Sequence, residues 1–129
     1  MWSETQGYKH PLYDAKEKVA AGSVADVLTF GPVRTGRLWV LSKVVVYDGN
    51  NAPTSARAYI KGGGVQVDVG AIASFVAAEA GVMDGPIYVP EGRELEVYVV
   101  GATSNDGLRV SINGYEVDQL PEGVGYEAK

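Results

Sequence analysis

The pattern of residues 36–47 is the most informative feature of this chain, because almost every position in it is apolar. If the segment is an extended strand, one of its faces carries Leu38, Val40, Val44 and Val46. The opposite face, which only Lys43 interrupts, carries Trp39, Leu41, Val45 and Tyr47. A strand with one solvated face alternates apolar with polar residues. We therefore expect both faces to be covered, the second one by another sheet, a terminal arm or a neighbouring subunit.

Shorter runs, in which apolar and polar residues alternate, predict further strands. They occupy residues 23–30, 55–61, 65–69, 94–100 and 108–117, with a short extended piece at 86–90. The inward positions of two of these runs are Ala56, Ala58 and Ile60, and Leu95, Val97 and Val99. Clusters of Gly, Pro, Asn and Asp separate the runs and indicate tight turns. About seven or eight short strands at this spacing predict an all-β fold, an antiparallel β-sandwich of the Greek-key or jelly-roll type.

Residues 70–85 leave two interpretations open. The alanines of residues 71–80 favour a helix, and the residues at helical spacing are Ile72, Phe75, Val76 and Glu79. Read as an irregular strand, the same segment carries on one face Ile72, Ser74, Val76 and Ala78. Periodicity does not decide between a short helix and a strand here.

Residues 1–18 form a polar and charged segment that nevertheless contains large apolar side chains. Those side chains are Trp2, Tyr8, Leu12 and Tyr13. Pro11 discourages a continuous helix. The alternatives are a disordered leader and an extended arm that docks its aromatic residues on another surface, and the aromatic content favours the arm. The predicted organisation is an N-terminal arm (1–18), a β-sandwich domain (19–118) and a C-terminal tail (119–129).

Charge and hydropathy narrow the possible partners. The formal net charge is −5, and the eleven lysines and arginines are scattered singly along the sequence. Because nucleic acids and anionic membranes attract clustered positive charge, we expect no nucleic acid and no membrane as a partner. No apolar run approaches the roughly 20 residues of a membrane span, and the first residues lack the pattern of a secretory signal. We therefore expect synthesis in the cytoplasm.

The chain offers little catalytic or redox chemistry. It contains no cysteine, which excludes a disulfide scaffold, a cysteine-based zinc site and a cysteine nucleophile. Its one histidine, His10, lies in the polar N-terminal segment, where we expect a solvated side chain rather than a member of a catalytic triad. Glu94 and Glu96 share a strand face at a separation of about 7 Å, but no apolar surroundings prepare either as a general acid. We predict no catalytic residues and no enzymatic activity.

Two loop sequences, residues 48–51 and 105–107, contain the Asp, Asn and Gly that occur in calcium loops. Neither has the regular oxygen spacing or the terminal glutamate of an EF-hand. Both are better explained as turns in which Asn and Asp adopt left-handed conformations. The glycines of residues 62–64 are followed by no Lys-Ser or Lys-Thr pair, so they do not form a phosphate-binding loop. We expect no cofactor and no metal.

Two longer stretches of the sequence match a known pattern. The first is Gly-Arg-Leu-Trp-Val-Leu-Ser-Lys-Val-Val-Val from residue 36, followed after a turn by Arg57. The second is Pro-Ile-Tyr-Val-Pro-Glu-Gly-Arg-Glu-Leu-Glu-Val from residue 86, followed by a turn at 101–107 and by Leu-Arg-Val-Ser-Ile from residue 108. Over residues 32–118 the chain resembles small β-sandwich virion proteins of tailed bacteriophages. The resemblance implies a structural role in the phage particle.

That role is expected to be capsid decoration (cement) on the outer surface of the virion, with the major capsid protein or another virion protein as the partner. Proteins of this kind often form trimers and reach their neighbours through an N-terminal arm, so we expect a homo-oligomer and favour a trimer. Because Trp and Tyr favour interfaces, the residues expected at the contact are Trp2, Tyr8, Leu12, Tyr13, Trp39, Leu41, Tyr47 and Tyr59. The alternative is a carbohydrate-binding module, or an adhesin domain of a tail or fibre, whose surface aromatics stack on sugar rings.

Overall fold

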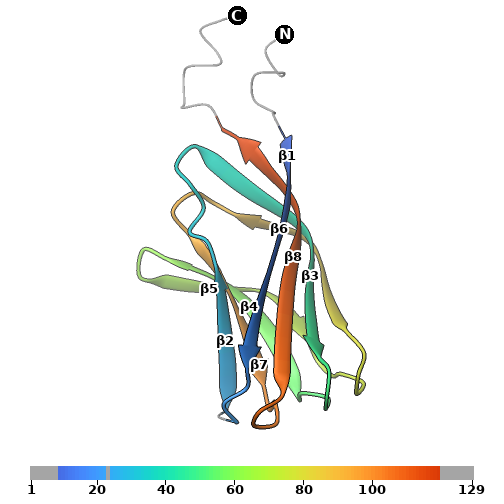
Figure 1. Cartoon of the computed structure of the whole chain (residues 1–129). Helices are drawn as coiled ribbons and strands as arrows, with labels where there is room; N and C mark the ends of the chain where they lie inside the picture. Colours follow the sequence, from blue (N-terminus) through green and yellow to red (C-terminus); the bar gives the residue numbers. More distant parts are fainter. Residues whose placement is uncertain (1–8, 23, 120–129) are drawn as a thin grey trace, which may run out of the picture.

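The computed structural model describes residues 9–22 and 24–119, which form eight β-strands in two facing sheets (Figure 1). The strands are β1 (Lys9–Val19), β2 (Ala25–Phe30), β3 (Arg37–Asp48), β4 (Ser55–Gly62), β5 (Val65–Ile72), β6 (Gly81–Val89), β7 (Glu94–Val100) and β8 (Gly107–Asp118). Sheet A has the strand order β1-β8-β3-β6, and sheet B has the order β2-β7-β4-β5. All paired strands are antiparallel. The predicted antiparallel β-sandwich is confirmed, and its strand order is that of a jelly roll.

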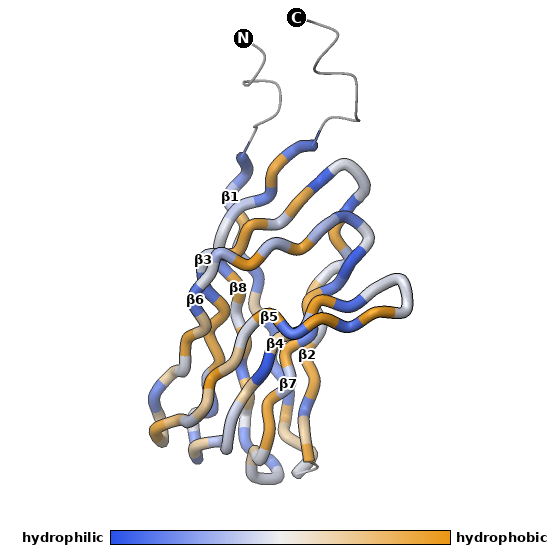
Figure 2. The backbone as a smooth tube through the Cα atoms, turned by 180° about the vertical axis from the view of Figure 1, so that it is seen from behind, coloured by the Kyte–Doolittle hydropathy of each residue, from blue (hydrophilic) through white to orange (hydrophobic). Residues whose placement is uncertain are grey.

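The core lies between the inner faces of the two sheets. Its apolar residues alternate with polar ones along several strands, as the hydropathy colours of Figure 2 show. The largest fully buried apolar side chains include Phe30, Leu41, Leu95, Leu108 and Ile112. The inward positions predicted for residues 55–61 and 94–100 are confirmed. Five of these side chains are fully buried, namely Ala56, Ala58, Leu95, Val97 and Val99. The alternation of apolar and polar residues was sufficient to predict which side chains point inward, because each of these two strands has one face in the core along its length.

A β-bulge at Ser42 changes the predicted faces of β3. The pairing of β3 with both of its neighbours shifts register between Leu41 and Lys43, so one extra residue resets the alternation. As a result, the core-facing apolar residues of β3 are Trp39, Leu41, Val44 and Val46. The outward-facing apolar residues are Leu38, Val40, Val45 and Tyr47. The predicted second face of Trp39, Leu41, Val45 and Tyr47 is therefore wrong, because a period of two does not continue through a bulge.

Residues 9–18, which the sequence assigned to a separate arm, belong to the sandwich. They form nearly all of β1, which pairs with β8 from Lys9 opposite Val117 to Val19 opposite Gly107. β1 is an edge strand that is exposed over most of its length, and charged residues on such an edge conceal its strand pattern. Leu12 nevertheless packs against the core. Residues 1–8 lie outside the described residues, so the predicted arm remains a prediction for them alone.

The segment 70–85 is neither the helix nor the single irregular strand that the sequence left open. β5 continues to Ile72, a loop follows, and β6 begins at Gly81. Phe75 in this loop packs against the core, and its ring approaches Gly81 so closely that a Cβ on that glycine would lie 2.6 Å from Cε2 of the ring. The loop is therefore held against the sandwich by one aromatic side chain.

Candidate functional site

The outer face of sheet A carries a row of apolar residues that crosses all four of its strands. Pro11 on β1 lies opposite Tyr115 on β8, which in turn lies opposite Val40 on β3. Val40 also lies opposite Tyr88 on β6. Residues that lie directly opposite one another on neighbouring strands point to the same side of a sheet. We refer to Pro11, Tyr115, Val40 and Tyr88 as the apolar row.

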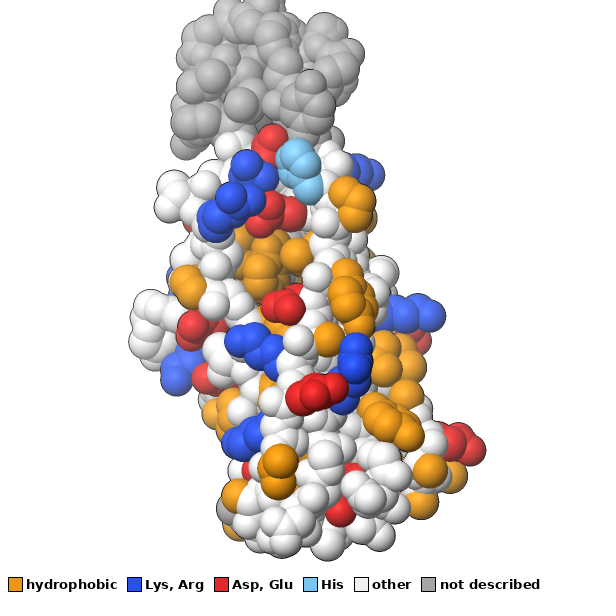
Figure 3. All heavy atoms as spheres, viewed as in Figure 1, with side chains coloured by type: hydrophobic (Ala, Val, Ile, Leu, Met, Phe, Trp, Pro, Cys, Tyr) orange, Lys and Arg blue, Asp and Glu red, His pale blue; other side chains and the backbone are white. Residues whose placement is uncertain are grey.

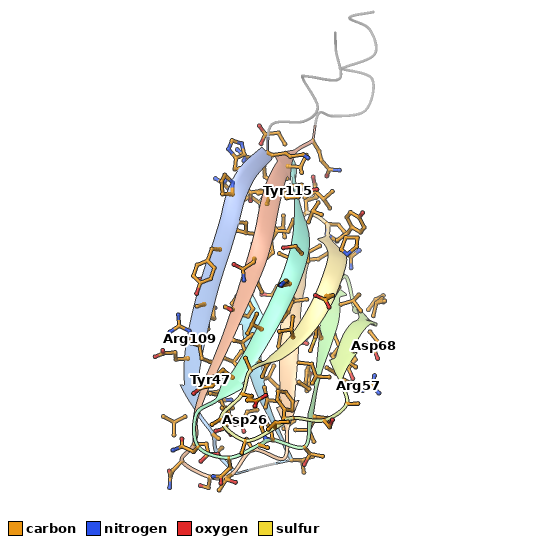
Figure 4. All side chains as sticks on the ribbon, turned by 90° about the vertical axis from the view of Figure 1, so that its right-hand side faces the viewer. Asp26, Tyr47, Arg57, Asp68, Arg109 and Tyr115 are labelled. Carbon is orange, nitrogen blue, oxygen red and sulfur yellow. The ribbon has the colours of Figure 1, made fainter. Side chains whose placement is uncertain are left out.

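The members of the apolar row differ in accessibility. Val40 is only 8% exposed although it takes no part in the core between the sheets, and it lies between the two tyrosines in the strand register. Tyr88 is itself 54% exposed. Nζ of Lys9 lies 4.7 Å from the centroid of the Tyr115 ring, which is a cation–π contact. Figure 4 views this face and labels Tyr115 near one end of β8.

Further apolar residues extend the apolar row along the strands. Leu38 lies opposite Val117 on one side of it. On the other side Val45 lies opposite Val82, which is 44% exposed. In Figure 3, hydrophobic side chains gather along the right-hand side of the molecule, where sheet A lies. An exposed apolar patch of this kind, interspersed with single polar residues, is typical of a surface that contacts another protein.

The outer face of sheet B has a different character, because polar groups there are paired with one another. The rings of Tyr59 and Tyr98 meet edge to face with a centroid distance of 5.1 Å and an interplanar angle of 78°. Nε2 of Gln66 lies 3.2 Å from Oε1 of Glu96 and 3.3 Å from the hydroxyl of Tyr98. Nζ of Lys61 lies 3.5 Å from Oε2 of Glu96. The two rings do not form a flat platform.

The residues predicted at a partner contact are divided among three environments. Leu41 is fully buried and Trp39 is 8% exposed, so neither is available to a partner, because both pack in the core between the sheets. Leu12 is half-buried against the core. Tyr13 and Tyr47 are exposed near the outer face of sheet A, Tyr59 lies on that of sheet B, and Trp2 and Tyr8 lie outside the described residues.

Sequence reasoning did not find Tyr115 and Val117 as members of the sheet A surface. Their odd-numbered positions continue the outward series that begins at Arg109 and Ser111 on β8, so simple alternation along this strand could have identified them. Tyr88 lies in the short extended piece predicted at residues 86–90, but the sequence alone did not place it beside Val40. That neighbourhood depends on the pairing of β3 with β6.

A buried carboxylate organises the end of the sandwich where β8 ends. Oε2 of Glu116 accepts a hydrogen bond from Nε1 of Trp39 at 3.1 Å. Oε1 accepts one from Nη2 of Arg34 at 2.9 Å and one from Nη1 of Arg37 at 3.0 Å. Burial by itself raises the pKa of Glu116, but the hydrogen bonds from Arg34 and Trp39 and the charges of Arg34 and Arg37 outweigh it and lower the pKa.

The described residues provide few other sites. A hollow of about 470 Å³ lies beside Tyr47 and Arg109, and another of about 310 Å³ lies beside Tyr88 and Arg93. No group of three or more His, Asp or Glu side chains within residues 9–22 and 24–119 is placed to hold a metal ion. The same residues include no helix that is long and apolar enough to cross a membrane.

Comparison with known proteins identifies similarity to solved structures. No protein-family model matches the chain, and no curated protein matches it. Among solved structures, the chain is similar to the N-terminal cellulose-binding domain of β-1,4-glucanase C from Cellulomonas fimi. The TM-score is 0.33 and the sequence identity is 17%, over 88% of this chain and 80% of that domain. A TM-score this low supports no functional conclusion.

Proposed function

We propose that this protein is a structural component of a tailed-phage particle, a decoration protein that binds the outer surface of the capsid through the outer face of sheet A. The observation that carries the proposal is the apolar row of Pro11, Tyr115, Val40 and Tyr88, which spans the full width of the sheet. A face of this kind is stabilised when another protein surface covers it. The sequence resemblance to small β-sandwich virion proteins supports the same role.

The energetics suit a protein that is present in many copies. Full burial of an apolar or aromatic side chain contributes about 1.5–3 kcal/mol, so a contact built on a few side chains such as Tyr88 binds weakly by itself. On a shell, copies that also touch one another reinforce each contact through effective concentration. The net charge of −5 suits an exterior position, away from packaged nucleic acid.

Co-sedimentation with capsids tests this proposal. The capsids come from the phage that encodes the chain, produced with the gene for this protein deleted. We expect the wild-type protein to bind them, and we expect the double variant Tyr88→Ser/Tyr115→Ser to bind at least about tenfold more weakly, because it loses two apolar contacts. The matched control is Tyr59→Ser/Tyr98→Ser, which removes two tyrosines from the opposite face and should bind like the wild type. Equal binding by both double variants contradicts the proposal, as does a wild type that does not bind.

A second candidate function is carbohydrate binding through the outer face of sheet B. The observation in its favour is that Tyr59 and Tyr98 lie together beside hydrogen-bonding groups of Gln66 and Glu96, since sugars are recognised by aromatic rings next to polar groups. A glycan array distinguishes the two functions. Binding that Tyr59→Ala abolishes and Tyr88→Ala does not would favour the carbohydrate-binding module, whereas an array without binding would leave the capsid role as the better explanation.

A further inference from the structure

Five carboxylate side chains are buried in the described residues, and three of them have a cation beside them. Asp26 lies 3.6 Å from Nζ of Lys18, and Glu96 lies 3.5 Å from Nζ of Lys61. Glu116 contacts two arginines. The remaining two are Asp48, which is 2% exposed, and Asp106, which is 5% exposed. Neither makes an ion pair with any Lys, Arg or His of the described residues.

Asp48 and Asp106 are brought together by the pairing of β3 with β8. Asp48 is the last residue of β3 and Asp106 immediately precedes β8, and Asp48 lies opposite Leu108 in the register. Nδ2 of Asn51, in the turn after β3, lies 3.2 Å from both carboxylate oxygens of Asp106. Oδ1 of Asn50 accepts the N–H of Gly107 at 3.4 Å. The two loops that resemble fragments of calcium loops in sequence therefore form a single cluster.

The two oxygens of Asp48 differ in the partners that the described residues give them. Oδ1 of Asp48 accepts the N–H groups of Asn50 at 2.9 Å and of Asn51 at 3.1 Å. Oδ2 is fully buried and has no hydrogen-bond donor among residues 9–22 and 24–119. A buried carboxylate oxygen without a donor is unfavourable, and a second carboxylate beside it adds repulsion between like charges. Either a proton shared by the two carboxylates or a bound cation relieves both costs.

We propose that Asp48, Asp106 and Asn51 bind a divalent cation of the Ca²⁺ type, which fastens the turn after β3 to the turn before β8. The donors are carboxylate and amide oxygens, which hard cations such as Ca²⁺ prefer. Asn51 is exposed, so an ion and its water ligands can enter from solvent. A half-turn of the Asn51 amide presents Oδ1 in place of Nδ2, and the two orientations differ only in which atom is assigned as nitrogen. With two carboxylates, we expect a Kd of about 10⁻⁴ to 10⁻³ M.

Thermal unfolding of the full chain tests the site. In buffer with EDTA, then with 10 mM CaCl₂ or 10 mM MgCl₂, we expect Ca²⁺ to raise the Tm of the wild type by roughly 3–10 °C and Mg²⁺ to raise it less. Asp106→Asn should lose most of this response. The matched control is Asp68→Asn, which removes an exposed carboxylate on β5 that is not part of the proposed site. This variant should keep the full increase in Tm on addition of Ca²⁺.

Isothermal titration of the wild type with CaCl₂ provides a second measurement that does not depend on the folding of any variant. Saturable binding of one Ca²⁺ per chain supports the site. The absence of binding up to 10 mM Ca²⁺ overturns it, and so does a Ca²⁺-induced Tm increase that is equal in the wild type and Asp106→Asn. A Tm that changes with pH but does not respond to Ca²⁺ would also overturn it, in favour of a proton shared by the two carboxylates.

Discussion

The two ends of the β3–β8 strand pair bury carboxylates in opposite ways. At the end where β3 begins, Glu116 receives hydrogen bonds from two arginines and an indole N–H. At the end where β3 finishes, the donors that the described residues offer to Asp48 and Asp106 are amide N–H groups. The two ends of this strand pair therefore hold a neutralised acid and an acid pair that no described Lys, Arg or His contacts. The difference teaches that burial does not determine whether a carboxylate stabilises a fold, because its partners do.

The largest effect is expected at the neutralised end. Glu116→Gln removes the charge that Arg34 and Arg37 contact, and we expect the free energy of unfolding to fall by about 2–3 kcal/mol. The expected loss is smaller than for a fully buried ion pair because Arg34 remains largely exposed to solvent. Urea unfolding monitored by tryptophan fluorescence measures it. The matched control is Glu79→Gln, in the exposed loop before β6. An equal loss of unfolding free energy in both variants would contradict a stabilising role for the contacts of Glu116 with the two arginines.

The opposite end should respond with the opposite sign. In buffer with EDTA, Asp106→Asn removes one of two adjacent negative charges and supplies an amide that can donate to the unpartnered oxygen of Asp48. We expect the free energy of unfolding to rise by about 1 kcal/mol. The same urea titration measures this change. A loss as large as that of Glu116→Gln would show that the two ends do not differ in the way their partners indicate.

The stabilising contribution of Glu116 should also depend on pH, and we expect this change in stability to be smaller than those above. The pKa of Glu116 is lowered in the folded protein, so its stabilising contribution is complete above the ordinary value of 4.5 and is lost as the pH falls through the lowered value. Besides Arg34 and Arg37, the nearby ionisable groups are His10 and Asp118, which lie 3.5 Å apart. We expect the stability difference between wild type and Glu116→Gln to shrink on acidification. A difference that is constant from pH 7 to pH 3 would contradict this.

The smallest effect is expected for an exposed ion pair. Nη1 of Arg57 lies 2.5 Å from Oδ2 of Asp68 on the outer face of sheet B, and both side chains are about half exposed (Figure 4). Water and salt screen such pairs, so Arg57→Ala should change the free energy of unfolding by about 0.5 kcal/mol or less. If Arg57→Ala lowered the free energy of unfolding as much as Glu116→Gln does, exposed and buried ion pairs of this protein would contribute equally to stability, and the expectation would be wrong.

The sequence predicted those parts of the fold that local patterns determine. The hairpin of β4 and β5 followed from alternation on either side of the glycines at 62–64, and β7 followed from Leu95, Val97 and Val99. The faces of β3 were wrong because the inserted residue, Ser42, looks like any other polar position in the sequence. β1 was missed because an edge strand needs few apolar residues, so its charged pattern resembled an arm.

The candidate sites were less predictable than the fold because they depend on contacts between distant segments. The sequence identified residues 48–51 and 105–107 as separate turns, and only the pairing of β3 with β8 places them together. The apolar row depends on three strand pairings at once, and its residues lie far apart along the chain. No local pattern contains this information.

The position of β1 beside β8 has a mechanical consequence. The described chain enters the sandwich at Lys9 and leaves it at Asp118, and these residues lie at the same end because Lys9 faces Val117. A tension applied at these two points would pull the strands apart sideways, so their hydrogen bonds would break one after another, as in a zipper, and not all together in shear. The fold therefore resists a pull applied at Lys9 and Asp118 only through the few β1–β8 hydrogen bonds that carry the load at any one time.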